Sequence, residues 1–576
     1  MTGDNNGRWA GDRDWPANHG DYLANAADTI KRLHNHPSLC YYGGGNELSP
    51  IPSPMSGSGV DGDSDQSTES PPVDIDRALR KLTTADGRPY VSSSVSDVGD
   101  SFDSARALAP KDGPYGIQPE EVFFDRNPGF TSPLLNEDEV KRNTTSLDVE
   151  GRPSAGRNIG FQTEVGSVSH PELDSLARLL SREVLAAYPD CGERGEVGGS
   201  VHEEWAYYKY LPFTDTDDVD HICQFKFPPA NDTSPHRMDS VEEYSWAAQF
   251  AQYLQYKSLL EGYSHRMWDW YSAVFLWKTS SPAPTLRGAL YDWRLAPTGA
   301  YWGARAGLAG GRPVRLILNL RDRTVHVANA APRAVLATSV KWSAYSLEGV
   351  LLMSGNIPVP LRNIAGDSVL HLEGSLPWVD ESLSFVPNSY SLQEVVLYVL
   401  DLPYVHRDDS GSSSSVKNSY YLTDPSSSAR SHARLRFSLL GAMRKKAPRV
   451  ELDVQCQMRS IIECTLKNAP GNNVAIMTKL TVAGKSSGNL TALHPALFSD
   501  NYITILPGAT SFVRMPLDSI EVLEHSPALK CSSDKVVKLL DPVNTELVIS
   551  VDGWNVQEVQ VQVFCDSGML SRVIIS

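Results

Sequence analysis

Cysteine is scarce in this sequence. Only seven cysteines occur in 576 residues. Their number is odd and their spacing is wide, so we do not expect a disulfide framework. No CxxC pair and no Cys/His spacing typical of a metal site is present. We therefore expect neither a metal nor another cofactor.

Long hydrophobic runs and a basic face are also missing. No apolar run approaches the ~18 residues that a transmembrane helix needs, so no membrane span is expected. The first residues, MTGDNNGRWAGDRDW, are polar and lack the apolar core of a signal peptide. The 52 Lys and Arg are outnumbered by 69 Asp and Glu, which gives a net charge of −17. Such a balance argues against nucleic acid or an anionic membrane as partner. Compartment and oligomeric state remain open.

Residues 1–310 alternate between helix-like and strand-like segments. The stretch DYLANAADTIKRLHNHP has apolar residues at helical spacing and stops before Pro37. A second helix is expected from about Ile75, followed by a strand over 90–95. A long amphipathic helix is predicted for SVEEYSWAAQFAQYLQYKSLLEGYSHRM. Alternation of this kind indicates parallel strands connected by crossover helices.

Short strands separated by turn clusters dominate the rest of the chain. VRLILNLRDRTVHVANAA begins one such series, and VELDVQCQM and NVAIMTKLTVAG belong to another. This spacing is typical of β-sandwiches, and we expect one over 311–430 and one over 431–576. The stretch 49–70 is rich in Ser, Gly, Pro and Asp, and is too polar to order itself.

Two glutamates stand at predicted strand ends. Glu47 follows YYGGGN and Glu164 lies within NIGFQTEVGS. In a parallel α/β barrel the carboxyl ends of the strands converge on one face, where the chemistry occurs. Glycoside hydrolysis needs one protonated and one ionised carboxyl group. The neighbouring amide of Asn46 could hydrogen-bond a sugar hydroxyl. Taken alone, an Asn-Glu pair at a strand end is more often a solvated surface feature.

Several ordered motifs together resemble glycoside hydrolase family 2. RLHNHPSLCYYGGGNEL resembles its acid/base segment, GFQTEVGSVSHPE its nucleophile segment, and DGPYGIQPEEVFF its GPY stretch. MWDWYSAVFLWKTSSPAPTLRGALYDW looks like the eighth barrel strand and the loop after it. FSDNYITILPG and VDGWNV look like the terminal β-domain of two related groups, the mannosylglycoprotein endo-β-mannosidases and the exo-β-glucosaminidases.

The resemblance implies roles for individual residues. Glu47 would be the general acid/base and Glu164 the nucleophile of a retaining mechanism, with no cofactor. Asn46 would contact the 2-hydroxyl of the sugar, and Tyr115 would hydrogen-bond the nucleophile. The remaining substrate-binding positions would be Trp277, which would form the floor of the sugar subsite, and, from the loop near the N-terminus, Asp4, Asn6 and Trp9.

The same resemblance predicts the architecture. We expect a multidomain protein with a partial (β/α)8 TIM barrel over 1–310 and then two Ig-like β-sandwich domains, 311–430 and 431–576. Family members begin with a jelly-roll domain, an Ig-like domain and three barrel strands. Residues 1–20 leave no room for these, so we expect a chain truncated at its N-terminus. We expect the stretch 49–70 to be a disordered insertion after the acid/base segment.

The expected function is retaining hydrolysis of a β-mannosidic bond, Manβ1-4GlcNAc, in oligosaccharides derived from N-glycans. One alternative is an exo-β-mannosidase or exo-β-glucosaminidase. The site of an endo-acting enzyme would differ from these, because it must leave room for branches on the reacting mannose. Another alternative is an inactive remnant or a carbohydrate-binding protein. The expected partner is an oligosaccharide substrate.

Overall fold

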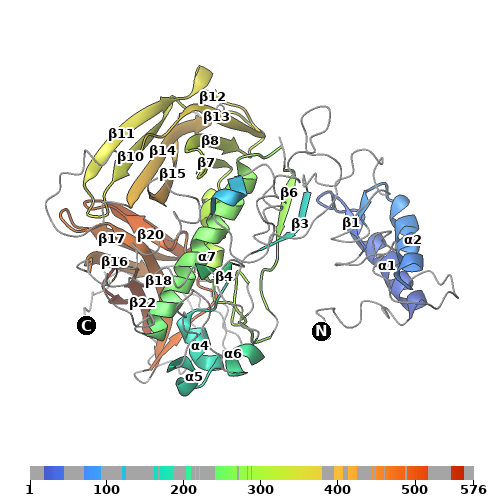
Figure 1. The fold of residues 1–576 in the computed structure, drawn as a ribbon. Helices are drawn as coiled ribbons and strands as arrows, with labels where there is room; N and C mark the ends of the chain where they lie inside the picture. The colour runs from blue at the N-terminus through green and yellow to red at the C-terminus, as the bar shows by residue number, and fades with distance from the viewer. Residues whose placement is uncertain are drawn as a thin grey trace, which may run out of the picture. The chain divides into compact units, whose positions relative to one another are not determined.

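The computed structural model describes most of the chain in two compact units (Figure 1). We name them the α/β unit, which comprises 1–113, 135–165 and 270–276, and the β-rich unit, which comprises 114–134, 166–269 and 277–576. The described residues are 18–44, 71–91, 120–124, 161–166, 169–186, 203–208, 214–215, 219–220, 240–268, 271–281, 283–286, 289–378, 395–406, 413–423, 444, 449–458, 461–486, 489–516 and 546–563.

Two helix–strand pairs form one part of the α/β unit. Helix α1 (His19–Leu33) precedes strand β1 (Tyr42–Gly43), and α2 (Pro71–Thr84) precedes β2 (Tyr90–Val91). The two strands pair in parallel, with Tyr42 opposite Tyr90. Parallel neighbours require a crossover connection, and α2 lies within that connection. This is the arrangement that the helix–strand alternation of the sequence predicts.

A second parallel pair belongs to the same unit. Strand β3 (Phe161–Val165) pairs with β6 (Ala273–Leu276). Tyr41, just before β1, stacks on Phe275 of β6 with ring centroids 6.4 Å apart. The described residues thus contain two pieces of parallel sheet but no closed barrel, and the barrel stays a prediction.

The first part of the β-rich unit is a β-sandwich. One sheet has the order β13-β8-β7, and the other has the order β11-β10-β14-β9-β12, with β15 paired to β14. Strand β10 shows why the sequence folds this way, because Val340, Trp342 and Ala344 alternate with polar residues and enter the core between the sheets. The strands are β7 (Val314–Leu318), β8 (Thr324–Asn329), β9 (Val335–Leu336), β10 (Ser339–Tyr345), β11 (Leu351–Pro358), β12 (Asn363–Ile364), β13 (Ser368–Ser375), β14 (Val396–His406) and β15 (Ser413–Leu422).

A second sandwich, which we call the terminal sandwich, follows. Its sheets have the orders β16-β17-β21 and β19-β18-β22-β23, with β20 paired to β18. In β16, buried and exposed residues alternate strictly. The strands are β16 (Leu452–Met458), β17 (Ile461–Asn468), β18 (Ala475–Ser486), β19 (Asn489–Ala492), β20 (Ile503–Ile505), β21 (Thr510–Pro516), β22 (Glu546–Asp552) and β23 (Val559–Val563).

One disulfide lies in this sandwich, although the sparse cysteines predicted no framework. Cys456 of β16 and Cys464 of β17 stand opposite each other in the register and are bonded. Both residues point into the core, where cysteine behaves as a small apolar side chain. The total count of cysteines could not reveal this pair, because it depends on how two neighbouring strands are aligned.

Helix α7 (Val241–Ser264) runs through the β-rich unit, with α8 (Gly299–Gly307) packed along it (Figure 1). The prediction of an amphipathic helix was wrong, because most of its residues are buried. Gly299, Gly303 and Gly307 bring α8 against the backbone of α7, and a Cβ atom on Gly303 would lie 2.1 Å from the Tyr253 carbonyl oxygen. Further sides of α7 are covered by the terminal sandwich and by the first sandwich.

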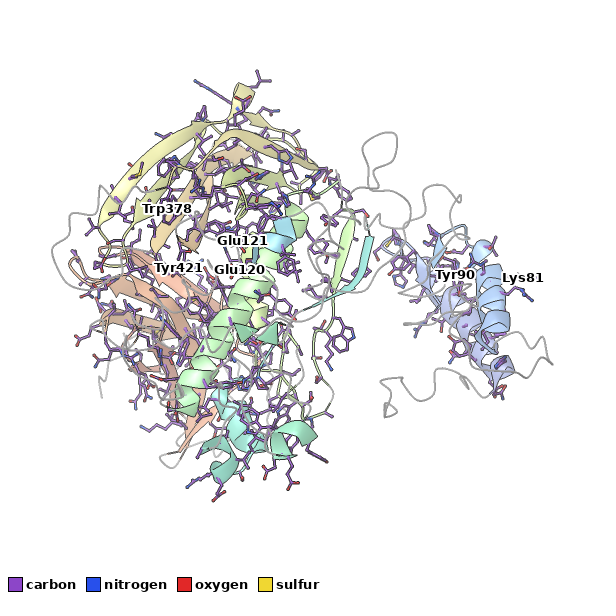
Figure 2. All side chains as sticks on the ribbon, in the orientation of Figure 1. Lys81, Tyr90, Glu120, Glu121, Trp378 and Tyr421 are labelled. Carbon is purple, nitrogen blue, oxygen red and sulfur yellow. A yellow bond between two sulfur atoms is a disulfide. The ribbon has the colours of Figure 1, made fainter. Side chains whose placement is uncertain are left out.

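Shorter elements complete the described structure. In η1, the buried Glu120 accepts a hydrogen bond from the Ser258 hydroxyl of α7, at 3.3 Å (Figure 2). No helix in the described part of the chain is long and apolar enough to span a membrane. The short elements are η1 (Glu120–Phe124), α4 (Leu173–Leu179), α5 (Arg182–Ala186), α6 (Glu203–Tyr207), β4 (Thr214–Asp215), β5 (Val219–Asp220), η3 (Ala309–Gly311) and η4 (Pro360–Arg362).

Candidate active site

Most of the predicted site residues lie outside the described residues. Strand β1 ends at Gly43, shortly before the predicted acid/base segment. Their roles stay predictions, as does the disorder of the stretch 49–70, which also falls outside. The residues concerned are Glu47, Asn46, Tyr115, Asp4, Asn6 and Trp9.

Glu164 lies on β3, at an irregular point of its pairing with β6. The register shifts between Gln162 and Val165, where Thr163 and Glu164 together lie opposite the single residue Phe275. An extra residue of this kind interrupts the alternation of a strand and redirects a side chain, and such bulges are frequent beside active sites. The backbone thus places Glu164 near the carboxyl end of a parallel strand, where a barrel would carry its chemistry.

Trp277 follows β6 directly, and Gly166 follows β3. The Trp277 side chain is half-buried, and the Lys278 ammonium lies 5.2 Å from the centroid of its ring. A Cβ atom on Gly166 would lie 2.0 Å from the Trp277 carbonyl oxygen, so only glycine fits here. The peptide bond between Trp277 and Lys278 is cis. Trp277 and Gly166, which follow the two paired strands, therefore pack closely on each other.

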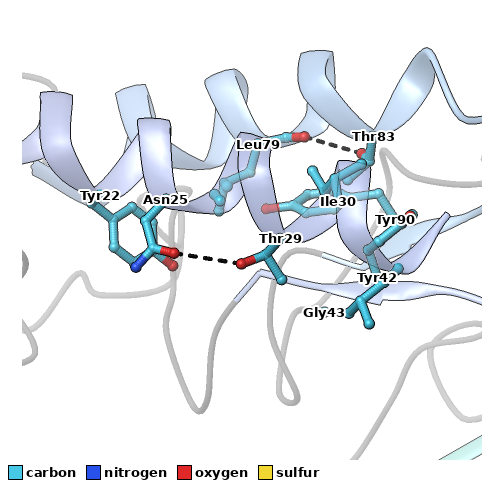
Figure 3. Close-up of a pocket in the computed structure, with 11 residues that line it drawn as sticks. Tyr22, Asn25, Thr29, Ile30, Tyr42, Gly43, Leu79, Thr83 and Tyr90 are labelled. Atoms are coloured by element: carbon cyan, nitrogen blue, oxygen red, sulfur yellow. Dashed lines mark hydrogen bonds between the residues drawn. The ribbon is translucent and has the colours of Figure 1, made fainter.

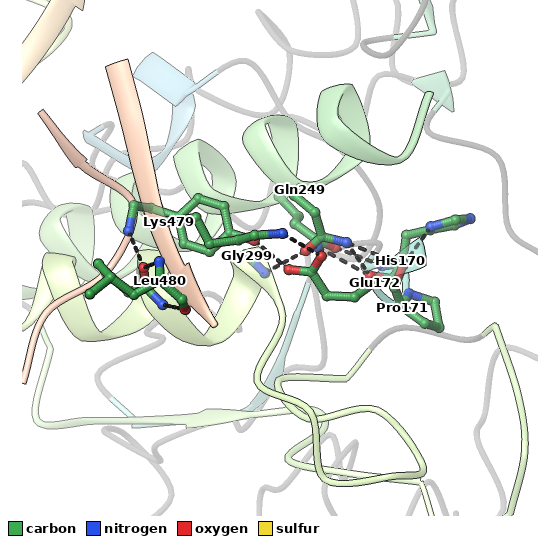
Figure 4. A network of polar contacts seen from close by, with 10 residues as sticks. His170, Pro171, Glu172, Gln249, Gly299, Lys479 and Leu480 are labelled. Carbon is green, nitrogen blue, oxygen red and sulfur yellow. Dashed lines mark hydrogen bonds and ion pairs between the residues drawn. The ribbon is translucent and has the colours of Figure 1, made fainter. Parts of the chain in front are cut away.

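Two buried glutamine side chains of α7 form hydrogen bonds with the segment after Gly166 (Figure 4). The backbone N–H of His170 donates to Gln252 Oε1 at 2.6 Å, and Gln249 Nε2 donates to the His170 carbonyl at 2.9 Å. Gln249 Oε1 also accepts from the backbone N–H of Gly299 at 2.7 Å. Burial lowers the pKa of His170 to about 4, so the ring is neutral at pH 7. Helix α7 thus satisfies backbone groups of His170 and Pro171 in this loop.

Two residues of the terminal sandwich hold the carboxylate of Glu172 (Figure 4). The Tyr502 hydroxyl donates to Glu172 Oε1 at 2.6 Å, and Lys479 Nζ lies 3.0 Å from Oε2. Lys479 Nζ is also 4.6 Å from the centroid of the Trp246 ring. Burial by itself would lower the pKa of Lys479, but the carboxylates of Glu172 and Asp552 outweigh it and raise that pKa. Lys479 is therefore charged at neutral pH.

Reasoning from sequence missed this contact. Glu172 ends the nucleophile motif and Tyr502 belongs to FSDNY, so both lie in stretches that had been singled out. Their pairing had no local signal, because Tyr502 and Lys479 lie 330 and 307 residues from Glu172 along the chain. Lys479 in particular looks like an ordinary polar residue of a strand.

A pocket of about 280 Å³ lies in the α/β unit, between its helices and strands (Figure 3). Its polar groups come from the side chains of Tyr22, Asn25, Thr29, Tyr42 and Tyr90, among others. None of the described residues that line it is a carboxylate, and we do not assign the catalytic chemistry to it.

Known proteins resemble this chain in sequence. Residues 429–534 match the exo-β-D-glucosaminidase Ig-fold domain family. The chain is 28% identical over 380 residues to a mannosylglycoprotein endo-β-mannosidase of Lilium longiflorum, a match that covers 61% of this chain and 33% of that protein. The chain resembles family 2 glycosidases. This confirms the resemblance that its motifs indicated. An exo-β-D-glucosaminidase of Arthroderma benhamiae is 24% identical over 376 residues, which cover 60% of this chain and 36% of that one.

Solved glycosidase structures share the fold. The exo-chitosanase CsxA of Amycolatopsis orientalis superposes with a TM-score of 0.60 at 17% identity, over 96% of this chain and 55% of that one. A β-D-mannosidase of Dictyoglomus thermophilum gives 0.53 at 14% identity, over 94% and 51%. The chain spans about a third of the length of the two curated relatives and about half that of the solved enzymes. The prediction of a multidomain, strand-rich protein with an Ig-like domain is confirmed.

Proposed function

We propose that the protein is a retaining glycosidase that cleaves the Manβ1-4GlcNAc bond of oligosaccharides derived from N-glycans. The observation that carries this proposal is the 28% identity over 380 residues to an endo-β-mannosidase. The position of Glu164 near the carboxyl end of a parallel strand, at a register irregularity, supports its role in particular.

The proposed mechanism uses two carboxyl groups about 5–5.5 Å apart. Glu164 attacks the anomeric carbon of the mannose and forms a glycosyl ester, while Glu47 gives its proton to the departing GlcNAc oxygen. Glu47 then takes a proton from water, which attacks the same carbon and releases Glu164. The two inversions give net retention. Asn46 would hold the 2-hydroxyl, and Trp277 would lie under the sugar ring, since aromatic faces stack well on sugars.

The variants Glu164→Ala and Glu47→Ala test the two roles separately. In Glu164→Ala, activity should return only when azide attacks directly, which gives the inverted glycosyl azide. In Glu47→Ala, substrates with good leaving groups still form the ester, and azide should rescue its breakdown with retained configuration. Glu183→Ala is the matched control, because this glutamate is exposed on α5 and should leave activity unchanged. Initial release of the α-anomer in NMR spectra of the wild-type reaction would refute retention and both roles.

An exo-β-glucosaminidase is the second candidate, because residues 429–534 match the Ig-fold domain of that class. Hydrolysis rates on p-nitrophenyl β-mannoside, p-nitrophenyl β-glucosaminide and an α-mannosylated Manβ1-4GlcNAc oligosaccharide distinguish the two. The primary proposal expects the branched oligosaccharide to be cleaved fastest. Preference for the glucosaminide would favour the second candidate instead.

A further inference from the structure

We infer that the outer face of the sheet β16-β17-β21 binds a neutral β-1,4-linked oligosaccharide, with Phe512 as the central contact. We call this face the Phe512 platform, and it lies wholly within the terminal sandwich. The inference goes beyond the proposed function, because the platform contains none of the proposed catalytic residues and its binding can be measured without any activity. Its outward side chains are Asp453, Gln455, Gln457, Glu463, Thr465, Lys467, Thr510, Phe512 and Arg514.

The platform follows from the alternation of residues along its three strands. Their apolar residues, such as Val454, Cys464 and Val513, belong to the core of the terminal sandwich. The residues between them therefore point outward and form a sheet face that is open to solvent. Three strands make this face about 10 Å wide, and three outward positions along one strand span about 14 Å. A short chain of sugar rings can lie across such a surface.

Phe512 is the one large apolar side chain among these outward positions, and it is 73% exposed. A lone exposed apolar residue is common on protein surfaces, and the neighbours of Phe512 are what sets it apart. In the register, Thr465 of β17 lies opposite Phe512, and Gln455 of β16 lies opposite Thr465. An aromatic ring on which a sugar can stack is thus accompanied by a hydroxyl and an amide that can bond its hydroxyls.

Paired polar groups flank Phe512 on both sides. On one side, Arg514 Nε lies 2.9 Å from Glu463 Oε1, and Gln457 Nε2 donates to Glu463 Oε2 at 2.9 Å. On the other side, Lys467 Nζ lies 3.6 Å from Asp453 Oδ2. The side chains of Arg514 and Lys467 nevertheless stay 67% and 49% exposed. Each carries several N–H donors, so those not used in the pair can reach the hydroxyls of a bound sugar.

The charges of the platform point to the class of ligand. Its two acidic and two basic side chains cancel, so the face is neutral within a chain of net charge −17. A nucleic acid or an anionic membrane would need an excess of positive charge. A neutral ligand with apolar faces and many hydroxyls matches the ring and its polar flanks. A β-1,4 linkage extends a hexose chain into a flat ribbon of this kind, whereas an α-1,4 linkage coils it.

The experiment observes Phe512 directly in the full protein. All 15 phenylalanines are replaced by fluorophenylalanine, and the fluorine NMR signal that Phe512→Leu lacks is assigned to Phe512. The titrations use the Glu164→Ala background, in which the proposed activity cannot consume the sugar. Chitotetraose, which is β-1,4-linked, should shift this signal saturably, and α-1,4-linked maltotetraose should leave it in place. The absence of a saturable shift with chitotetraose, or an equal shift with maltotetraose, overturns the inference.

Two variants locate the binding on the platform. Arg514→Gln removes charged donors beside Phe512 and should raise the dissociation constant read from the Phe512 signal roughly five- to tenfold. Leu490→Ala is the matched control, because Leu490 is 46% exposed on β19 of the other sheet and should leave this constant unchanged. Unchanged affinity in Arg514→Gln, or an equal loss in Leu490→Ala, contradicts the inference.

Sedimentation tests whether a second copy of the chain occupies the platform instead. The wild type and Phe512→Ala should sediment with the same mass. A dimer that Phe512→Ala dissociates would assign the platform to self-association and overturn the inference. A wild type without glycosidase activity would refute the proposed function, while the Phe512 signal would still decide whether the platform binds a sugar.

Discussion

The described residues of the α/β unit and those of the β-rich unit differ sharply in the size of the buried core they form. Among the described residues of the α/β unit, the buried cluster consists of Ile75, Leu79 and Tyr90, with a few half-buried neighbours. The β-rich unit contains two large clusters, one in each sandwich, and the cluster of the terminal sandwich includes residues of α7. Glu164, the proposed nucleophile, belongs to the unit with the small core. We therefore expect the β-rich unit to supply most of the stability, and under the proposed function the α/β unit carries the proposed catalytic residues Glu47 and Glu164.

The largest expected effect is the loss of unfolding free energy on truncating one buried aromatic residue of the β-rich unit. Trp554 is 2% exposed and meets Phe250 of α7 edge to face, with ring centroids 5.3 Å apart. Trp554→Ala should lower the free energy of unfolding by about 3–5 kcal/mol, because the cavity cannot collapse between a helix and two sheets. Leu79→Ala in the small core should lower it by about 2 kcal/mol, since this site borders an open pocket and can relax.

Urea denaturation measures both variants on the same protein. An unfolding free energy that falls more for Leu79→Ala than for Trp554→Ala would reverse the assignment of stability to the two units.

The next effect depends on pH and on His326 of the first sandwich. Its ring is buried and close to His265 and His371, with ring centroids 5.4 and 4.5 Å away. Burial, and then these histidines and Arg266, lower the pKa of His326 to about 3. Its pKa is therefore lower in the folded than in the unfolded state, and its stabilising contribution is complete above pH 6.5. This contribution is lost progressively as the pH falls towards 3.

The variant His326→Asn tests whether this histidine causes the loss of stability at low pH. Between pH 7 and pH 4 the wild type should lose roughly 3 kcal/mol more stability than the variant, at about 1.4 kcal/mol for each unit of pKa shift. Parallel pH profiles of the two proteins in urea denaturation would show that His326 does not carry this dependence. Asp322 is a nearby carboxylate, and it acts on His265, whose pKa it raises.

Local patterns in the sequence were sufficient to predict some of these features and not others. The alternation of apolar and polar residues along β16 predicted a sandwich strand, because successive side chains of a strand point to opposite faces of the sheet. The burial of α7 could not be predicted from its local sequence pattern. Gln249, Gln252 and Lys257 look like a polar face, and they are buried because partners distant in sequence satisfy them. Polarity predicts exposure only where such partners are missing.

In the candidate site, too, local sequence patterns predict some features, while others depend on partners that are distant in the sequence. The strand that carries Glu164 was predicted from the sequence, within NIGFQTEVGS. The shift in register at Glu164 was not, because it depends on the alignment with β6. The partners of Glu172 lie in the terminal sandwich, more than 300 residues further along the chain, and no local pattern indicates them.

The smallest effects come from the same substitution in a helix of each unit. Gly303 of α8 faces the backbone of α7, where a Cβ atom would lie 2.1 Å from the Tyr253 carbonyl oxygen and 2.8 Å from its carbonyl carbon. The helices must separate to admit a methyl group, and Gly303→Ala should cost about 1–3 kcal/mol. In α1, by contrast, the nearest atom to a Cβ on Gly20 is Asn18 Oδ1 at 3.5 Å, an ordinary contact. Gly20→Ala should stabilise the protein by about 0.5 kcal/mol, because alanine leaves the unfolded chain less freedom to lose.

Opposite signs for these two variants in urea denaturation would support a tightly packed β-rich unit and an α/β unit that tolerates change. A neutral Gly303→Ala would mean that α8 can move away from α7 at little cost. The close backbone approach would then contribute little to stability, and the contrast between the two units would rest on the side-chain cores alone.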